Sequence, residues 1–190
     1  MLEHCVLLRS VIILPYINYG LLVWGFANID IIFKLQKKIV RLIDRAFFLE
    51  HTEKLFKKYN LLKVHDLVKY RCLVFYFKLK NEMLPTKIES LFICPSSEIS
   101  VNQRRLRSND SNLPLILHTT NTRSGENCLR YYLPTYINSC HTSLIVAVEL
   151  KTLVNFKKIA KNTLLDNYSI DECQLSNCYS CSLKIFSQLL

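Results

Sequence analysis

The sequence predicts a mainly α-helical fold with a small β-ribbon in the middle and an irregular tail that contains cysteines. Only three of the 190 residues are Gly and five are Pro, so long stretches run without helix breakers. Half of the residues are hydrophobic, which is ample for a core. In several stretches, apolar residues recur at the three- and four-residue spacing of an amphipathic helix.

The first apolar stretch, residues 11–29, is uncharged and about long enough to span a bilayer. Five residues interrupt it: Pro15, Asn18, Gly20, Gly25 and Asn28. These residues favour a buried element with a bend at Pro15 or Gly20. A protein associated with a membrane through residues 11–29 is the alternative.

A helix is expected next, from Asn28 and Asp30 to about Phe47. One face has the apolar spacing of a core-facing stripe, formed by Ile32, Leu35, Ile39, Leu42 and Ile43. The opposite face is basic and consists of Lys34, Lys37, Lys38, Arg41 and Arg45. It is the densest cationic row in the first half of the chain, although such faces are often only solvated.

A short helix should follow, with Thr52 as its N-cap and Glu53 in its first turn. It is predicted to end near Tyr59, with Asn60 in the left-handed conformation after its C-terminus. Its inner face is expected to hold Leu55, Phe56 and Tyr59.

A longer helix is predicted over residues 64–81, and Pro85 should end its pattern. The residues expected to point inward are Leu67, Tyr70, Leu73, Val74 and Phe77. Together, the predicted helices up to residue 95 form one helical region.

Residues 96–141 are predicted to be loop-rich, because polar residues replace the periodic apolar ones. Short β-prone runs at 115–120 and 129–133, with a turn at Ser124-Gly125, predict the β-ribbon. Residues 142–168 form a helical region, with a helix over about 143–166 that could break near Leu153, and residues 169–190 form the tail. The core candidates of that helix are Leu150, Val154, Ile159, Leu164 and Leu165.

The chain is strongly basic, with 25 Lys and Arg against 15 Asp and Glu, a net charge of +10. Such a field attracts polyanions, either nucleic acid or an anionic membrane surface. Basic residues near aromatic ones, such as Arg123 and Arg130 near Tyr131 and Tyr132, could pair with phosphates and stack on bases. The candidate contacts are Lys37, Lys38, Arg41, Arg104, Arg105, Arg107, Arg123 and Arg130.

No pattern of catalysis is present. The acidic residues are scattered singly apart from Asp171-Glu172, the five His are isolated, and there is no Gly-rich phosphate loop. We therefore expect no active site and no cofactor.

The eight cysteines are not expected to form disulfides, because no secretory signal is recognisable. An intracellular location, cytoplasmic or nuclear, is expected. Five cysteines stand singly and are interpreted as reduced core thiols: Cys5, Cys72, Cys94, Cys128 and Cys140. Cys173, Cys178 and Cys181 have a spacing that could contribute to a zinc site, but no fourth ligand follows them, so surface thiols are the default interpretation.

Five blocks, in unbroken order, resemble the C-terminal part of jockey-like reverse transcriptases from retrotransposons that lack long terminal repeats. The first, LPYINYGLLVWG, matches the family's Pro, Tyr-Gly and Trp-Gly positions with Pro15, Tyr19, Gly20, Trp24 and Gly25. The next are LQKKIVRLI (35–43) and the segment from His51 to Pro85. The last two are NTRSGENCLRYYLPTYINS (121–139) and LVNFKKIAKNTLLDNY (153–168).

This resemblance covers residues 9–168 and implies a helical thumb that grips template RNA and growing DNA. It implies contact with RNA or an RNA–DNA hybrid, with Lys37, Lys38, Arg41, Arg123 and Arg130 as the matching basic residues. The family's catalytic Asp-Asp pair is absent, so no polymerase activity is expected, and the palm and fingers of a parent polyprotein would precede Met1. In residues 133–141, the positions that hold Gly, Trp, Leu and the final Pro in the family carry other residues, as expected in a decayed copy of the element. The alternative is thus a decayed mobile-element reading frame without a selected function.

Overall fold

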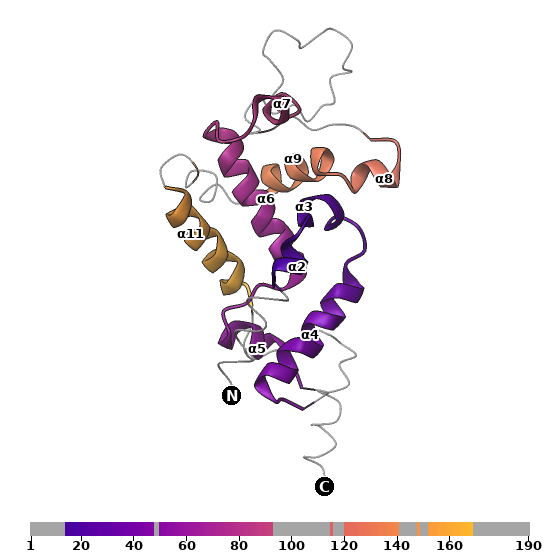
Figure 1. Ribbon diagram of the computed structural model, residues 1–190, viewed down its shortest axis with the longest axis vertical. Coiled ribbons are helices and arrows are strands. Elements are labelled where there is room, and N and C mark those ends of the chain that lie inside the picture. The colour runs from indigo at the N-terminus through magenta and orange to yellow at the C-terminus, as the bar shows by residue number, and fades with distance from the viewer. Residues whose placement is uncertain are drawn as a thin grey trace. The chain divides into compact units, whose positions relative to one another are not determined.

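All regular secondary structure in the described part of the chain is helical (Figure 1). The computed structural model describes residues 14–47, 50–92, 115, 120–140, 148 and 152–168. This confirms the prediction of a mainly α-helical protein. The helices are α2 Leu14–Asn18, α3 Leu21–Trp24, α4 Asp30–Asp44, α5 Glu53–Lys58, α6 Val64–Lys80, α7 Thr86–Glu89, α8 Arg123–Glu126, α9 Leu129–Ser139 and α11 Leu153–Asp166.

The predicted β-ribbon is wrong where the structure describes it. Its second strand, 129–133, is the first half of α9, and its turn lies within α8. Local β-propensity is overridden because the helix buries Leu133 and Ile137 completely, one turn apart on one face. Of the first predicted strand, only its two end residues belong to the described part.

The described helices belong to two compact units. The first unit holds α2, α4, α5, the start of α6 and the C-terminal end of α11. The second unit holds α3, the rest of α6, α7, α8, α9 and the N-terminal part of α11. Two helices, α6 and α11, therefore contribute residues to both units.

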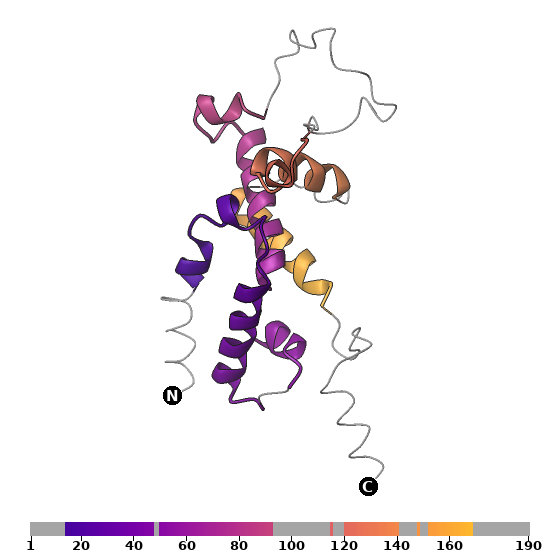
Figure 2. The ribbon, with the colours of Figure 1, turned by 90° about the vertical axis from the view of Figure 1, so that its right-hand side faces the viewer.

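In the first unit, α4 and α5 lie side by side, as both ribbon views show (Figures 1 and 2). Phe56 of α5 is fully buried and stacks on Phe33 of α4 with 6.3 Å between ring centres. The predicted inward stripe of α4 is partly wrong. Gln36 is buried beside Val40 and Ile43, and two residues of the expected stripe are exposed instead: Leu35 and Leu42.

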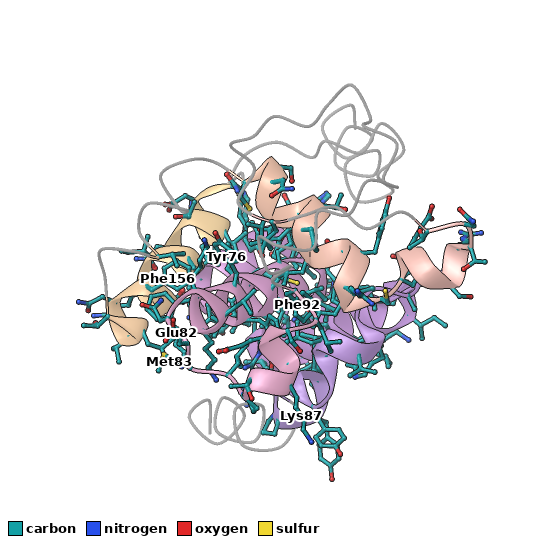
Figure 3. All side chains as sticks on the ribbon, turned by 90° about the horizontal axis from the view of Figure 1, so that it is seen from above. Tyr76, Glu82, Met83, Lys87, Phe92 and Phe156 are labelled. Atoms are coloured by element: carbon teal, nitrogen blue, oxygen red, sulfur yellow. The ribbon has the colours of Figure 1, made fainter. Side chains whose placement is uncertain are left out.

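In the second unit, α6 is the central element. It buries residues on most of its circumference, among them the predicted Leu73, Val74 and Phe77. Phe77 stacks on the fully buried Phe156 of α11 with ring centres 4.9 Å apart. Seen from above, Tyr76, Phe92 and Phe156 lie among the packed side chains of the helices (Figure 3).

The C-terminal helix confirms part of its predicted core. Leu164 and Leu165 are buried, but Val154 is 71% exposed, so its assignment to the core is wrong. The side chain that α11 buries in its first turns is Phe156 instead. Leu150 lies outside the described residues.

In the described part of the apolar stretch, residues 14–29, the helix is interrupted at Gly20, one of the two positions predicted for a bend. The prediction of a buried element is wrong for much of this part, because Tyr16, Tyr19 and Val23 are 78%, 84% and 81% exposed. Gly20 separates α2 from α3 and has a φ of 60°, in the left-handed region that glycine adopts without steric cost. A Cβ on Gly25 would lie 2.8 Å from Cγ2 of Val68, so this glycine permits a close approach of α3 to α6. Throughout the described ranges, no helix has the length and apolarity needed to cross a bilayer.

Three helices end with a non-glycine residue at positive φ. These residues are Arg45, Asn60 and Glu82, with φ of 54°, 52° and 52°. The prediction for Asn60 is confirmed: its N–H bonds to Lys57 O, and the next N–H bonds to Phe56 O, the two bonds of a Schellman cap. Thr52 is the N-cap residue of α5, as predicted, but its side chain makes no capping hydrogen bond.

Replacing Glu82 with glycine should stabilise the protein. Left-handed backbone costs an ordinary residue about 1–2 kcal/mol, and the entropy of glycine in the unfolded chain offsets part of that gain. We expect the free energy of unfolding to rise by roughly 0.5–1 kcal/mol in a urea titration. Asn60→Gly is the matched control and should change it less, since Asn tolerates this conformation. Equal effects of the two substitutions would contradict the expectation.

Candidate nucleic-acid interface

One face of α4 carries the basic side chains that the sequence predicts as a nucleic-acid contact. Residues separated by three or four positions share a face of a helix. The cationic row comprises Lys34, Lys37, Lys38, Arg41 and Arg45, the last directly after the helix. From Lys34 to Arg45 it extends about 16 Å. One strand of a duplex presents roughly five phosphates over that distance.

The members of the cationic row differ in what they contact. Lys37 places Nζ 4.3 Å from the ring centre of Phe33, a cation–π contact. Arg41 is half-buried and donates from Nε to the carbonyl oxygen of Glu50 at 2.9 Å. Burial lowers the pKa of Arg41, while the charge of Glu50 opposes this effect.

Lys34 and Lys38 are the exposed members within α4 itself, one turn apart. Lys38 is one of the contacts that the sequence predicts, whereas Lys34 belongs to the cationic row but not to the predicted contacts. The four-residue spacing between them is the signal that would have found Lys34.

The acidic residues at the two ends of α4 are engaged by groups outside the row. Asp30 lies 3.4 Å from Nε2 of His65. Asp44 pairs with Lys58 and accepts a hydrogen bond from the Tyr59 hydroxyl at 2.6 Å. The hydrogen bond from Lys58, followed by that from Tyr59, lowers the pKa of the Asp44 carboxyl. Of the two acidic residues, Asp44 is thus paired with a lysine that does not belong to the row.

Gln36 fastens the buried face of α4 to the start of α6. Its Nε2 donates to Leu62 O at 2.9 Å, and its Oε1 accepts from the Val64 N–H at 2.9 Å. Both bonds are buried, and Gln36 is only 7% exposed. It thus satisfies one of the first N–H groups of α6, which lack partners within the helix.

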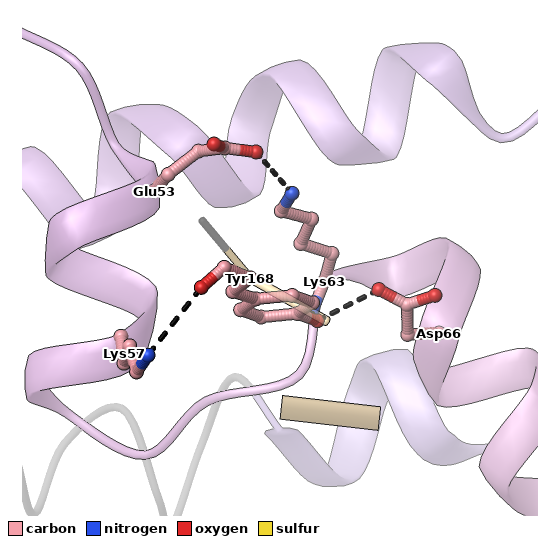
Figure 4. Close-up of polar contacts among 5 residues, drawn as sticks. All are labelled: Glu53, Lys57, Lys63, Asp66 and Tyr168. Atoms are coloured by element: carbon pink, nitrogen blue, oxygen red, sulfur yellow. Dashed lines mark hydrogen bonds and ion pairs between the residues drawn. The ribbon is translucent and has the colours of Figure 1, made fainter. Parts of the chain in front are cut away.

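Tyr168 makes a second contact with the start of α6 (Figure 4). Its hydroxyl donates to Oδ2 of Asp66 at 2.7 Å and accepts from the Lys63 N–H at 2.9 Å. The Lys63 ammonium lies 4.4 Å from the ring centre and pairs with Glu53. Burial raises the pKa of Tyr168, so the hydroxyl stays protonated as a donor. We interpret Tyr168 as a structural residue that holds the end of α11 to the start of α6. No pattern in the sequence predicts this role.

Lys57 completes this cluster. Its Nζ donates to the carbonyl oxygen of Tyr168 at 3.4 Å. Two of the three lysines of α5 thus make structural contacts, since Lys58 pairs with Asp44, while Lys54 is exposed. In the first unit, Gln36 binds α4 to the start of α6, and Tyr168 binds the same start of α6 from the end of α11.

The remaining described candidates belong to the second unit. Arg123 and Arg130 are exposed at the starts of α8 and α9. The neighbouring Tyr132 ring packs on Phe26 at 4.6 Å and on Tyr136 at 6.1 Å. Tyr131 is half-buried. The other basic candidates, Arg104, Arg105 and Arg107, lie outside the described residues.

The cysteines show mixed environments. Cys72 is fully buried, as predicted, and burial raises its pKa to about 12. Cys128 is exposed, so its assignment to the core is wrong, and Cys140 is half-buried. Among the described side chains, no three His, Cys, Asp or Glu are grouped to hold a metal ion. Cys5, Cys94, Cys173, Cys178 and Cys181 lie outside this part.

No protein-family model, curated protein or solved structure matches the chain.

Proposed function

We propose that this chain binds RNA or an RNA–DNA hybrid without catalysis, through the cationic row of α4. The observation that carries the proposal is the pair of exposed lysines, Lys34 and Lys38, one turn apart on α4, whose C-terminal acid Asp44 pairs with Lys58. Each phosphate that such a surface contacts releases a counterion from the nucleic acid, which favours binding.

Two features of the sequence support this function. The net charge of +10 attracts any polyanion at long range. The five blocks that resemble the C-terminal part of a jockey-like reverse transcriptase suggest a role in gripping nucleic acid beside a separate palm and fingers region. Without paired carboxylates to hold two metal ions, we expect the chain alone not to incorporate nucleotides.

A charge-matched pair of variants tests the site. In filter binding of the full chain to a labelled single-stranded RNA, Lys34→Gln with Lys38→Gln should weaken binding about tenfold at low salt, because two phosphate contacts are lost. The control, Lys157→Gln with Lys158→Gln, removes two exposed lysines from α11 and the same net charge. It should weaken binding much less.

Equal weakening by the two double variants would show that net charge, and not the cationic row, determines binding. The absence of any RNA or hybrid binding at low salt would contradict the proposed function itself.

A further inference from the structure

The apolar sector of α4 is wider than the surface that the first unit covers. Val40 and Ile43 are buried. Beside this buried face runs an aliphatic strip of Ile31, Leu35 and Leu42, which are 71%, 52% and 78% exposed. Single exposed aliphatic residues are common on proteins. Here three exposed aliphatic residues lie along about 16 Å of one helix, interrupted by Lys38 between Leu35 and Leu42. An exposed apolar strip of this length can mark an interaction site.

The strip has the spacing of a helix–helix seam. Lys38 lies between Leu35 and Leu42, and Arg45 follows, so positions 31, 35, 38, 42 and 45 are separated by four, three, four and three residues. This alternation is the heptad pattern along which a second helix packs its side chains. The spacing of these residues therefore favours a helix as the binding partner of the strip.

The charge beside the strip indicates what that helix carries. Lys38 is exposed within the seam and Lys34 is exposed next to it. Asp44, at the C-terminal end of α4, pairs with Lys58. Asp30, at the N-terminal end, places Oδ1 3.4 Å from Nε2 of His65. We infer that the aliphatic strip docks an acidic amphipathic helix of a partner protein, with its apolar side chains on the strip and its carboxylates on Lys34 and Lys38.

Other occupants fit the strip less well. The seam is centred on Lys38, so two copies packed strip to strip would bring their Lys38 ammonium groups together in either helix direction, which disfavours pairing. Nucleic acid gains little from the strip, because bases stack on aromatic rings and guanidinium groups and not on aliphatic side chains. A bilayer interface usually also engages aromatic residues, which the strip lacks.

The docking has a consequence for the cationic row. The carboxylates of the partner helix would occupy Lys34 and Lys38, the lysines assigned above to phosphate contact. Partner and nucleic acid should therefore exclude one another. This consequence rests on the proposed function, whereas the docking itself does not.

The probe for the test is a labelled helical peptide with Leu at the core heptad positions and Glu at the flanking positions. Its binding to the full chain is measured by fluorescence anisotropy. Leu35→Gln with Leu42→Gln should weaken binding at least about tenfold, because apolar burial is lost. Val154→Gln, an equally exposed aliphatic residue on α11, is the control and should leave binding unchanged. A second peptide, with Ser in place of Leu and the same Glu residues, should not bind.

Several results would overturn the inference. The Ser peptide could bind as tightly as the Leu peptide, or the double Leu variant could bind as well as the wild type. The variant could instead dissociate a dimer in sedimentation or abolish uptake by phosphatidylserine vesicles that occurs without peptide binding. A peptide of residues 169–190 that binds the strip more tightly than the probe would equally overturn it. RNA binding by the double Leu variant should stay at the wild-type level, so failure of the peptide test leaves the proposed function standing.

Discussion

Substitution of Phe156 by alanine is expected to destabilise the protein by about 3–5 kcal/mol, the usual cost of removing a buried phenyl ring. Phe156 is fully buried and stacks on Phe77 of the central helix α6. The alanine variant loses the free energy gained by burying the phenyl ring. It also leaves a cavity that the surrounding helices can fill only partly. The measurement is a urea titration followed by far-ultraviolet circular dichroism.

Val154→Ala, two residues earlier on the same helix, is the matched control. Val154 is 71% exposed, so its loss should change the free energy of unfolding by less than about 0.5 kcal/mol. The pair also tests which side of α11 faces the core, since the sequence favoured Val154. Similar losses for both variants would contradict the packing of this helix.

Substitution of Gln36 by leucine should cost about 2–4 kcal/mol, although leucine is apolar and close to glutamine in size. The variant leaves the Val64 N–H and the Leu62 carbonyl buried without their partner, and each such group costs about 1–3 kcal/mol. The same urea titration measures the loss. A neutral or stabilising effect would show that these two bonds do not hold α4 to the start of α6.

Gln36→Glu separates the hydrogen bonds from the shape of the side chain. A protonated Glu can donate to Leu62 O and accept from the Val64 N–H, whereas a buried carboxylate can only accept and pays for desolvation. The folded state therefore favours the protonated form and raises the pKa of the new side chain. Relative to wild type, the variant should be most stable at acidic pH and should lose that stability as the pH rises through the raised pKa. A constant difference across pH would contradict this role.

Local patterns were sufficient to predict the helices α4, α5 and α6. The periodicity of 30–44, the break after Asn60 and the apolar run from Val64 each correspond to an element that forms at that place. These features depend on residues close in sequence, such as the left-handed cap at Asn60. The cationic row could be predicted for the same reason, because it is a property of one helix.

The features that the sequence did not predict depend on contacts between residues far apart in the chain. The choice of Gln36 over Leu35 as a buried residue of α4 depends on hydrogen bonds to Leu62 and Val64, 26 and 28 positions away. The start of α6 is held by Tyr168, more than 100 positions away. Residues 129–133 have β-prone composition, yet burial of Leu133 within a helix prevails. Lys57 is likewise bound to the carbonyl oxygen of Tyr168, 111 positions away.

The salt dependence of RNA binding is the most direct test of a phosphate-gripping helix. The logarithm of the association constant should fall linearly with the logarithm of the salt concentration, by about 0.7 per single-strand phosphate contacted. The Lys34→Gln and Lys38→Gln double variant should flatten this slope by about 1.4, which corresponds to two lost contacts. An unchanged slope in the double variant, or a flat response in the wild type, would contradict the assignment of phosphate contacts to α4.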